Sequence, residues 1–155
     1  MHKLIVNASF LVLIALTSFT PKGNLEVKGT FSCYINDKPF ILEGVNARMR
    51  TVTGGYKQLS ISNDMFTSFF FINPEAKEFQ LKPSNKKEAV VRYTNPVNLN
   101  LYYPNTGIVK INVLDEKIKT LSGEFEMELM PKEGVTGKKI KVTQGKFLNI
   151  PIIYN

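Results

Sequence analysis

The segments "LSGEFEMEL" (residues 121–129) and "GKKIKVTQGKF" (residues 137–147) decide the fold class of this chain. In the first segment apolar and acidic residues alternate, which is the pattern of a β-strand with one buried face and one face in water. The second segment places Ile140 and Val142 on one face and Lys139 and Lys141 on the other. We therefore predict a C-terminal β-hairpin whose acids and lysines are cross-strand neighbours on the solvent face.

The glutamates of the first segment, Glu124, Glu126 and Glu128, also raise a less favoured alternative, a carboxylate-dependent hydrolase. Side chains two residues apart on one strand face lie roughly 6.5 to 7 Å apart, and glycosidase carboxylates have comparable separations. Such carboxylates need different environments, one of them poor in water. Because these glutamates are expected to be uniformly exposed and paired with lysines, we favour a solvated face and expect no catalytic residue.

Short alternating or apolar runs recur along the rest of the chain and are separated by turn signals. The clearest turn signals are "NDKP" (36–39), Gly54-Gly55 and "YPNTG" (103–107). The expected strands are residues 27–35, 40–42, 47–53, 56–62, 66–72, 79–81, 89–93, 97–103 and 108–114, followed by the C-terminal hairpin. About ten short strands predict an all-β domain, a single antiparallel β-sandwich, with a β-barrel as the alternative.

One break in the alternation lies in "TQGKF" (143–147). Val142 and Phe147 share a face only if the strand shifts its register between them. We therefore predict a β-bulge or bend at Gln144–Gly145.

The N-terminal segment "MHKLIVNASFLVLIALTSFT" (1–20) has the features of an export signal. It carries Lys3 first, then an apolar stretch, then small residues, and its apolar run is shorter than the ~20 residues of a membrane-spanning helix. We predict a signal peptide over residues 1–20, with the cleavage site left open, and a single β-domain over residues 21–155. The mature protein is then exported and does not span the membrane.

Loss of that segment removes His2, the only histidine, and with it every catalytic triad or zinc site that needs one. The only cysteine, Cys33, shares a strand face with Val27, Phe31 and Ile35, so we expect it to be packed inside. No phosphate-binding loop or calcium loop is present in the sequence. We expect no enzyme activity, no cofactor and no metal.

The formal net charge of +7 favours contact with anionic surfaces, but the lysines are scattered along the chain and form no single basic helix. We therefore expect no nucleic acid partner. An envelope protein or a glycan is the expected partner. Tyr102 and Tyr103 point to opposite faces of one strand, so one of them should face water beside a turn, and both are candidate contact residues.

Four segments, "GTFSCYINDKPF", "GGYKQLSIS", "LSGEFEMEL" and "GKKIKVTQGKF", resemble a family of small exported β-domains of Bacteroidota. The resemblance covers about residues 29–147 and implies an antiparallel β-sandwich-like domain of unknown molecular function, often a lipoprotein. Many relatives carry a cysteine for lipid attachment directly after the signal segment, and no cysteine occurs here before Cys33. The departure implies a periplasmic or secreted protein.

These observations predict an exported cell-envelope β-domain with a binding or scaffolding role. The alternative from another functional class is a carrier of a small apolar ligand. Its barrel cavity would be lined by Phe66, Phe70, Ile72 and Leu99.

Overall fold

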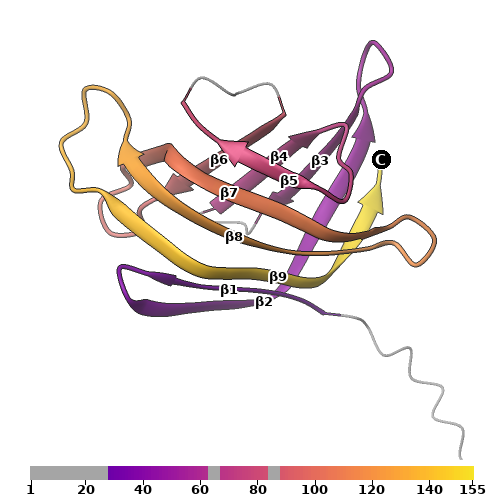
Figure 1. The fold of residues 1–155 in the computed structure, drawn as a ribbon, viewed down its shortest axis with the longest axis horizontal. Coiled ribbons are helices and arrows are strands. Elements are labelled where there is room, and N and C mark those ends of the chain that lie inside the picture. The colour runs from indigo at the N-terminus through magenta and orange to yellow at the C-terminus, as the bar shows by residue number, and fades with distance from the viewer. Residues whose placement is uncertain (1–27, 63–66, 84–87) are drawn as a thin grey trace, which may run out of the picture.

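The computed structural model describes residues 28–62, 67–83 and 88–155, and these residues form nine strands (Figure 1). The strands are β1 (Gly29–Ile35), β2 (Lys38–Thr51), β3 (Lys57–Ser62), β4 (Thr67–Ile72), β5 (Glu78–Leu81), β6 (Ala89–Thr94), β7 (Leu101–Asp115), β8 (Thr120–Pro131) and β9 (Ile140–Tyr154). The predicted all-β class is confirmed. No helix that could cross a membrane is present among the described residues, and the predicted signal peptide lies outside them.

Eight of the strands close into a barrel. The order around the ring is β7-β6-β4-β3-β2-β1-β9-β8, and the pairing of β8 with β7 completes it. β5 is an additional strand that pairs with β7. The pairings are antiparallel apart from a short parallel contact between Ala47–Met49 of β2 and Ile152–Tyr154 of β9. Of the two predicted architectures, the barrel is the one that this chain adopts.

The predicted C-terminal hairpin is confirmed as β8 and β9. Its β-bulge, predicted at Gln144–Gly145, lies one residue earlier, at Thr143–Gln144. Phe125 lies opposite Gly145 and Met127 lies opposite Val142, so one residue of β8 faces two residues of β9 between these pairs. Gln144 has a positive φ of 51°. The extra residue turns the chain so that Val142 and Phe147 both face the interior, as the sequence pattern requires.

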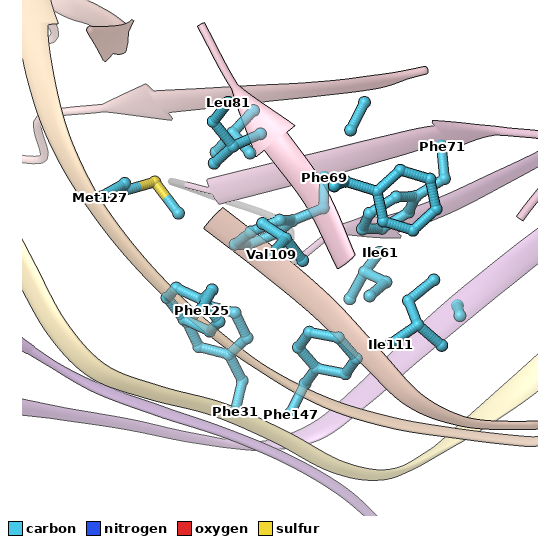
Figure 2. Packing of buried hydrophobic residues seen from close by; sticks show 14 of the residues in the cluster. Phe31, Ile61, Phe69, Phe71, Leu81, Val109, Ile111, Phe125, Met127 and Phe147 are labelled. Atoms are coloured by element: carbon cyan, nitrogen blue, oxygen red, sulfur yellow. The ribbon is translucent and has the colours of Figure 1, made fainter. Parts of the chain in front are cut away.

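The centre of the barrel is filled by aromatic rings (Figure 2). The ring centroids of Phe31 and Phe69 both lie 5.0 Å from that of Phe125, and the Phe147 ring lies 6.3 Å from it. The two central glycines of the hairpin lie opposite two of these phenylalanines, Gly123 opposite Phe147 and Gly145 opposite Phe125. A Cβ atom at either glycine would overlap the facing ring, so the glycines provide the space in which the rings lie.

Three predicted elements differ in the structure. The segments 40–42 and 47–53 belong to one strand, β2, which continues through Gly44, whose φ is +73°. The "YPNTG" segment is not a turn, because β7 runs through it with Asn105 as a bulged residue. The chain turns earlier, at residues 95–100, where the Asn95 amide donates to the Asn100 carbonyl (2.9 Å). As a result the described residues form nine strands, where the sequence pattern gives eleven segments.

The strand β4 carries apolar residues on both faces, which is typical of a strand buried on both sides, but the structure buries only one of its faces. Phe69 and Phe71 face the core, whereas Phe70 is half-buried and Ile72 is exposed. The outward ring of Phe70 is covered by the Arg92 guanidinium, 5.6 Å from its centroid. The strand therefore has one buried face, and a cation shields part of the other.

Candidate functional site

The described core side chains leave little space inside the barrel. The void between the core side chains, including Phe31, Cys33 and Phe69, has a volume of about 10 Å³, which is at most enough for one water molecule. A barrel of eight strands is compatible with a binding or carrier role, because its interior either closes on its own side chains or holds one small ligand. In this barrel the side chains fill the space.

Three of the four residues predicted to line a carrier cavity, Phe70, Ile72 and Leu99, are described, and they do not lie in the core. Ile72 is exposed, Phe70 is half-buried on the outer face, and Leu99 lies in the turn before β7 with 73% of its surface exposed. Phe66 lies outside the described residues. The prediction is wrong because successive side chains of β4 alternate between the two faces. Phe69 and Phe71 point inward, so their neighbours Phe70 and Ile72 point outward.

The acid row of β8 is a solvated face, as predicted. Glu128 forms an ion pair with Lys139 (Oε1 to Nζ, 2.8 Å), and Glu124 lies 3.7 Å from the Lys110 ammonium of β7. Hydrogen bonds from Lys139 and then from Asn105 hold the pKa of Glu128 below its ordinary value. A general acid of a glycosidase needs a raised pKa, so Glu128 has the opposite environment from the one that this role requires.

The two candidate contact residues, Tyr102 and Tyr103, do lie on opposite faces. Tyr102 is buried, with its ring centroid 6.0 Å from that of Tyr93. Tyr103 is half-buried and lines a small pocket of about 40 Å³ together with Pro83 and Pro104. Of the two, only Tyr103 can be reached by a ligand or partner.

Cys33 is buried, as predicted. Burial raises the pKa of its thiol to about 11, so the thiol is almost entirely protonated at neutral pH. A protonated, enclosed thiol is a weak nucleophile, and Cys33 acts as a small apolar side chain of the core.

Two larger pockets open on the outside of the barrel. The first, the wall pocket, has a volume of about 340 Å³ and lies over β5, β7, β8 and β9. Its charged lining residues are Glu126, Glu128 and Lys141. Because acids and a lysine are mixed there, and Glu128 is engaged by Lys139, the wall pocket does not favour a ligand of one charge sign.

The second, the basic pocket, has a volume of about 430 Å³ and is lined by residues of the β7–β8 turn, of the start of β1, of the middle of β2 and of the last part of β9. Its lining residues are Lys28, Gly29, Gly44, Asn46, Ile118, Lys119, Thr120, Pro151 and Ile152. Two of these are cationic, none is acidic, and three carry aliphatic or proline side chains. The volume is in the range of about 300 to 1,000 Å³ that is usual for small-molecule sites.

The β7–β8 turn that carries Ile118 and Lys119 is held in place by several contacts. The Asp115 carboxylate accepts hydrogen bonds from the amides of Lys117 (2.8 Å) and Ile118 (3.0 Å). The Lys119 carbonyl accepts from the Ile152 amide (2.8 Å), and the Lys119 ammonium lies 5.8 Å from the centroid of the Tyr154 ring. These contacts dock the turn against β9, so this wall of the pocket is formed before any ligand arrives.

The basic pocket was missed by sequence reasoning. Its residues come from four separate segments, 28–29, 44–46, 118–120 and 151–152, and no two of these share a motif. The only local signal is the exposed aliphatic Ile118 in a lysine-rich turn, "EKIK" (116–119).

The described His, Cys, Asp and Glu side chains form no group of three that could hold a metal ion. No protein family, curated protein or solved structure matches this chain.

Proposed function

We propose that this protein is an exported envelope β-barrel that binds a small organic anion in the basic pocket. The observation that carries the proposal is the composition of this pocket: the described residues that line it include two lysines, Lys28 and Lys119, and three apolar side chains, and none of them is acidic. The ammonium groups suit a carboxylate, and the Asn46 amide and the Thr120 hydroxyl suit its polar neighbours. Ile118, Pro151 and Ile152 suit an apolar body of the ligand.

Binding can be tested by following the backbone amide signals during a titration with sodium octanoate, with the uncharged octanamide as comparison. We expect octanoate to shift the signals of Asn46, Ile118 to Thr120 and Ile152, and octanamide to bind more weakly. Lys28→Gln and Lys119→Gln should each weaken octanoate binding about fivefold, which corresponds to the ~1 kcal/mol of a favourable exposed charge pair.

The matched control is Lys146→Gln, because this change removes the same charge from an exposed position of β9 that does not line the pocket. It should leave octanoate affinity within about a factor of two, since interactions beyond a Debye length of ~8–10 Å are screened. Equal losses from all three substitutions would show that octanoate responds only to net charge, and the proposed site would be rejected.

Export is supported by the signal-like residues 1–20 and by the resemblance to exported domains of Bacteroidota. A secretory signal is removed during export. We expect the full chain, expressed in a bacterium with an outer membrane, to be recovered from the periplasm or medium with a new N-terminus near residues 18–21. N-terminal sequencing checks this, and a cytoplasmic product that begins at Met1 would refute export.

A further inference from the structure

The first half of β2 pairs with a described strand on only one of its sides. Residues Lys38–Glu43 pair with β1, whereas pairing with β3 begins at Asn46 and pairing with β9 at Ala47. Among the described residues, no strand pairs with the other side of the segment 39–43, which we call the free edge. An unpaired edge presents amide and carbonyl groups to which another strand can bind.

The register between β1 and β2 determines which backbone groups point to the free edge. A two-residue turn, Asn36–Asp37, joins the strands, and both residues have positive φ, as a tight hairpin turn requires. The pair that flanks such a turn, Ile35 and Lys38, is hydrogen-bonded, and hydrogen-bonded and non-bonded pairs alternate from there. The non-bonded pairs are then Tyr34–Pro39, Ser32–Ile41 and Thr30–Glu43.

In a non-bonded pair the amide and the carbonyl of each residue point away from the partner strand. The amides and carbonyls of Ile41 and Glu43 therefore point to the free edge. Pro39 supports this assignment because proline has no N–H. At a bonded position it would remove a hydrogen bond from the β1–β2 ladder, whereas at a non-bonded position it removes none. The free edge thus offers two donors and two acceptors from Ile41 and Glu43.

The side chains of this segment are also incompletely covered. Phe40 and Leu42 pack against the core but remain only partly buried. Ile41, on the outer face, has 66% of its surface exposed. A strand added along the free edge would cover the remaining apolar surface of Phe40 and Leu42.

We propose that the free edge pairs with the same edge of a second copy of this chain, antiparallel about a twofold axis through Leu42. In this register Ile41 of each copy lies opposite Glu43 of the other, and the four donors and acceptors form four hydrogen bonds. The two Leu42 side chains meet on the inner face at the closest spacing of an antiparallel pair.

A second copy suits the free edge better than an unrelated strand because the edge is its own complement. Its donors and acceptors are equal in number and lie symmetrically about Leu42, which is the condition for a twofold contact. Pro39, which offers no amide, ends the pairing on both sides. The interface is small, so the dimer is weak and forms at high protein concentration.

Sedimentation velocity of the purified protein over roughly 10 µM to 1 mM tests the proposal, a range suited to weak contacts. We expect a monomer at the low end and a rising dimer fraction at the high end. Ile41→Pro removes the edge donor without removing a bond to β1, so it should abolish the dimer and leave the far-ultraviolet circular dichroism unchanged. The matched control, Ile41→Thr, keeps the amide and should keep the dimer.

A second variant decides the question if Ile41→Pro does not fold. Leu42→Cys places the thiols of two copies across the twofold axis, at a spacing of about 4.5 Å between Cα atoms that permits a disulfide. It should form a disulfide-linked dimer under mild oxidation, whereas Val113→Cys, at an exposed position on β7, should not. A wild-type protein that stays monomeric throughout, a dimer that survives Ile41→Pro, or equal cross-linking of both cysteine variants would overturn the proposal. Neither Ile41 nor Leu42 lines the basic pocket, so dimerisation and octanoate binding are measured independently.

Discussion

Gly123→Ala should lower the free energy of unfolding by about 3 kcal/mol, at the upper end of the usual cost of overpacking a core. A Cβ atom at this position would overlap two groups, the Phe147 ring and the backbone carbonyl oxygen of Lys110 on β7. The carbonyl belongs to the β7–β8 ladder and cannot rotate away as a side chain can. Because the chain contains no tryptophan, urea unfolding followed by far-ultraviolet circular dichroism is the suitable measurement.

The neighbouring glycine provides the matched comparison. A Cβ atom at Gly145 would overlap only the Phe125 ring, so Gly145→Ala should cost less, about 2 kcal/mol. Adding Phe125→Leu should recover part of that loss, whereas adding Phe147→Leu to Gly123→Ala should not, because the clash with the Lys110 carbonyl remains. Gly134→Ala, which meets no atom within 4 Å, should cost only the ~1 kcal/mol of its positive φ. If Gly123→Ala were as mild as Gly134→Ala, the close approach of β7 and β8 would be wrong.

The hairpin was predictable because its alternation is local. The pattern of β8 and β9 gave the inward face, the solvated acids and the bulge, and the structure has all three. The space that Gly123 and Gly145 leave for Phe147 and Phe125 was not predictable, because it depends on which residues of the two strands stand opposite each other. That register follows from the bulge at Thr143–Gln144, whose exact place the alternation alone does not determine.

The choice between sandwich and barrel was not predictable from the same alternation, since both architectures bury one face of each strand. The decision lies in the long-range pairing of β1 with β9, and in the way β2 pairs with both β1 and β3. Gly44 allows β2 to leave β1 and continue beside β3 within one strand. In the sequence that glycine resembles a break between two short strands, and "YPNTG" resembles a turn for the same reason.

The candidate site was less predictable than the fold. Tyr102 and Tyr103 were chosen as tyrosines beside a turn, but the turn is a bulge, and Tyr102 lies in the core. The basic pocket is formed by chain segments that only the closed barrel brings together. The lysines of this pocket belong to the lysines that are scattered along the sequence. The order of charges along a chain does not show which of them lie close together in the folded protein.

Phe69→Ala should lower the free energy of unfolding by about 3 to 5 kcal/mol, the usual cost of truncating a buried phenylalanine. Phe69 lies on β4, on the opposite side of the barrel from β1, β8 and β9, and its ring contacts those of Phe31, Phe125 and Phe147 (Figure 2). Its removal takes one ring out of a cluster that joins four strands. Urea unfolding measures the loss, and Phe70→Ala is the control one residue away, on the outer face, where we expect about 1 kcal/mol from its lost packing and its contact with Arg92.

The same variant tests whether the barrel is full. In the wild-type protein the void in the core is about 10 Å³, so an apolar molecule such as benzene should not raise the unfolding temperature. In Phe69→Ala the lost ring leaves an apolar cavity, and benzene should stabilise the protein by binding only to the folded state. Phe70→Ala opens no enclosed space and should not respond. If benzene raised the unfolding temperature of the wild-type protein as much as that of Phe69→Ala, the barrel would have an open lumen. A carrier of a small apolar ligand would then be a better functional proposal than anion binding in the basic pocket.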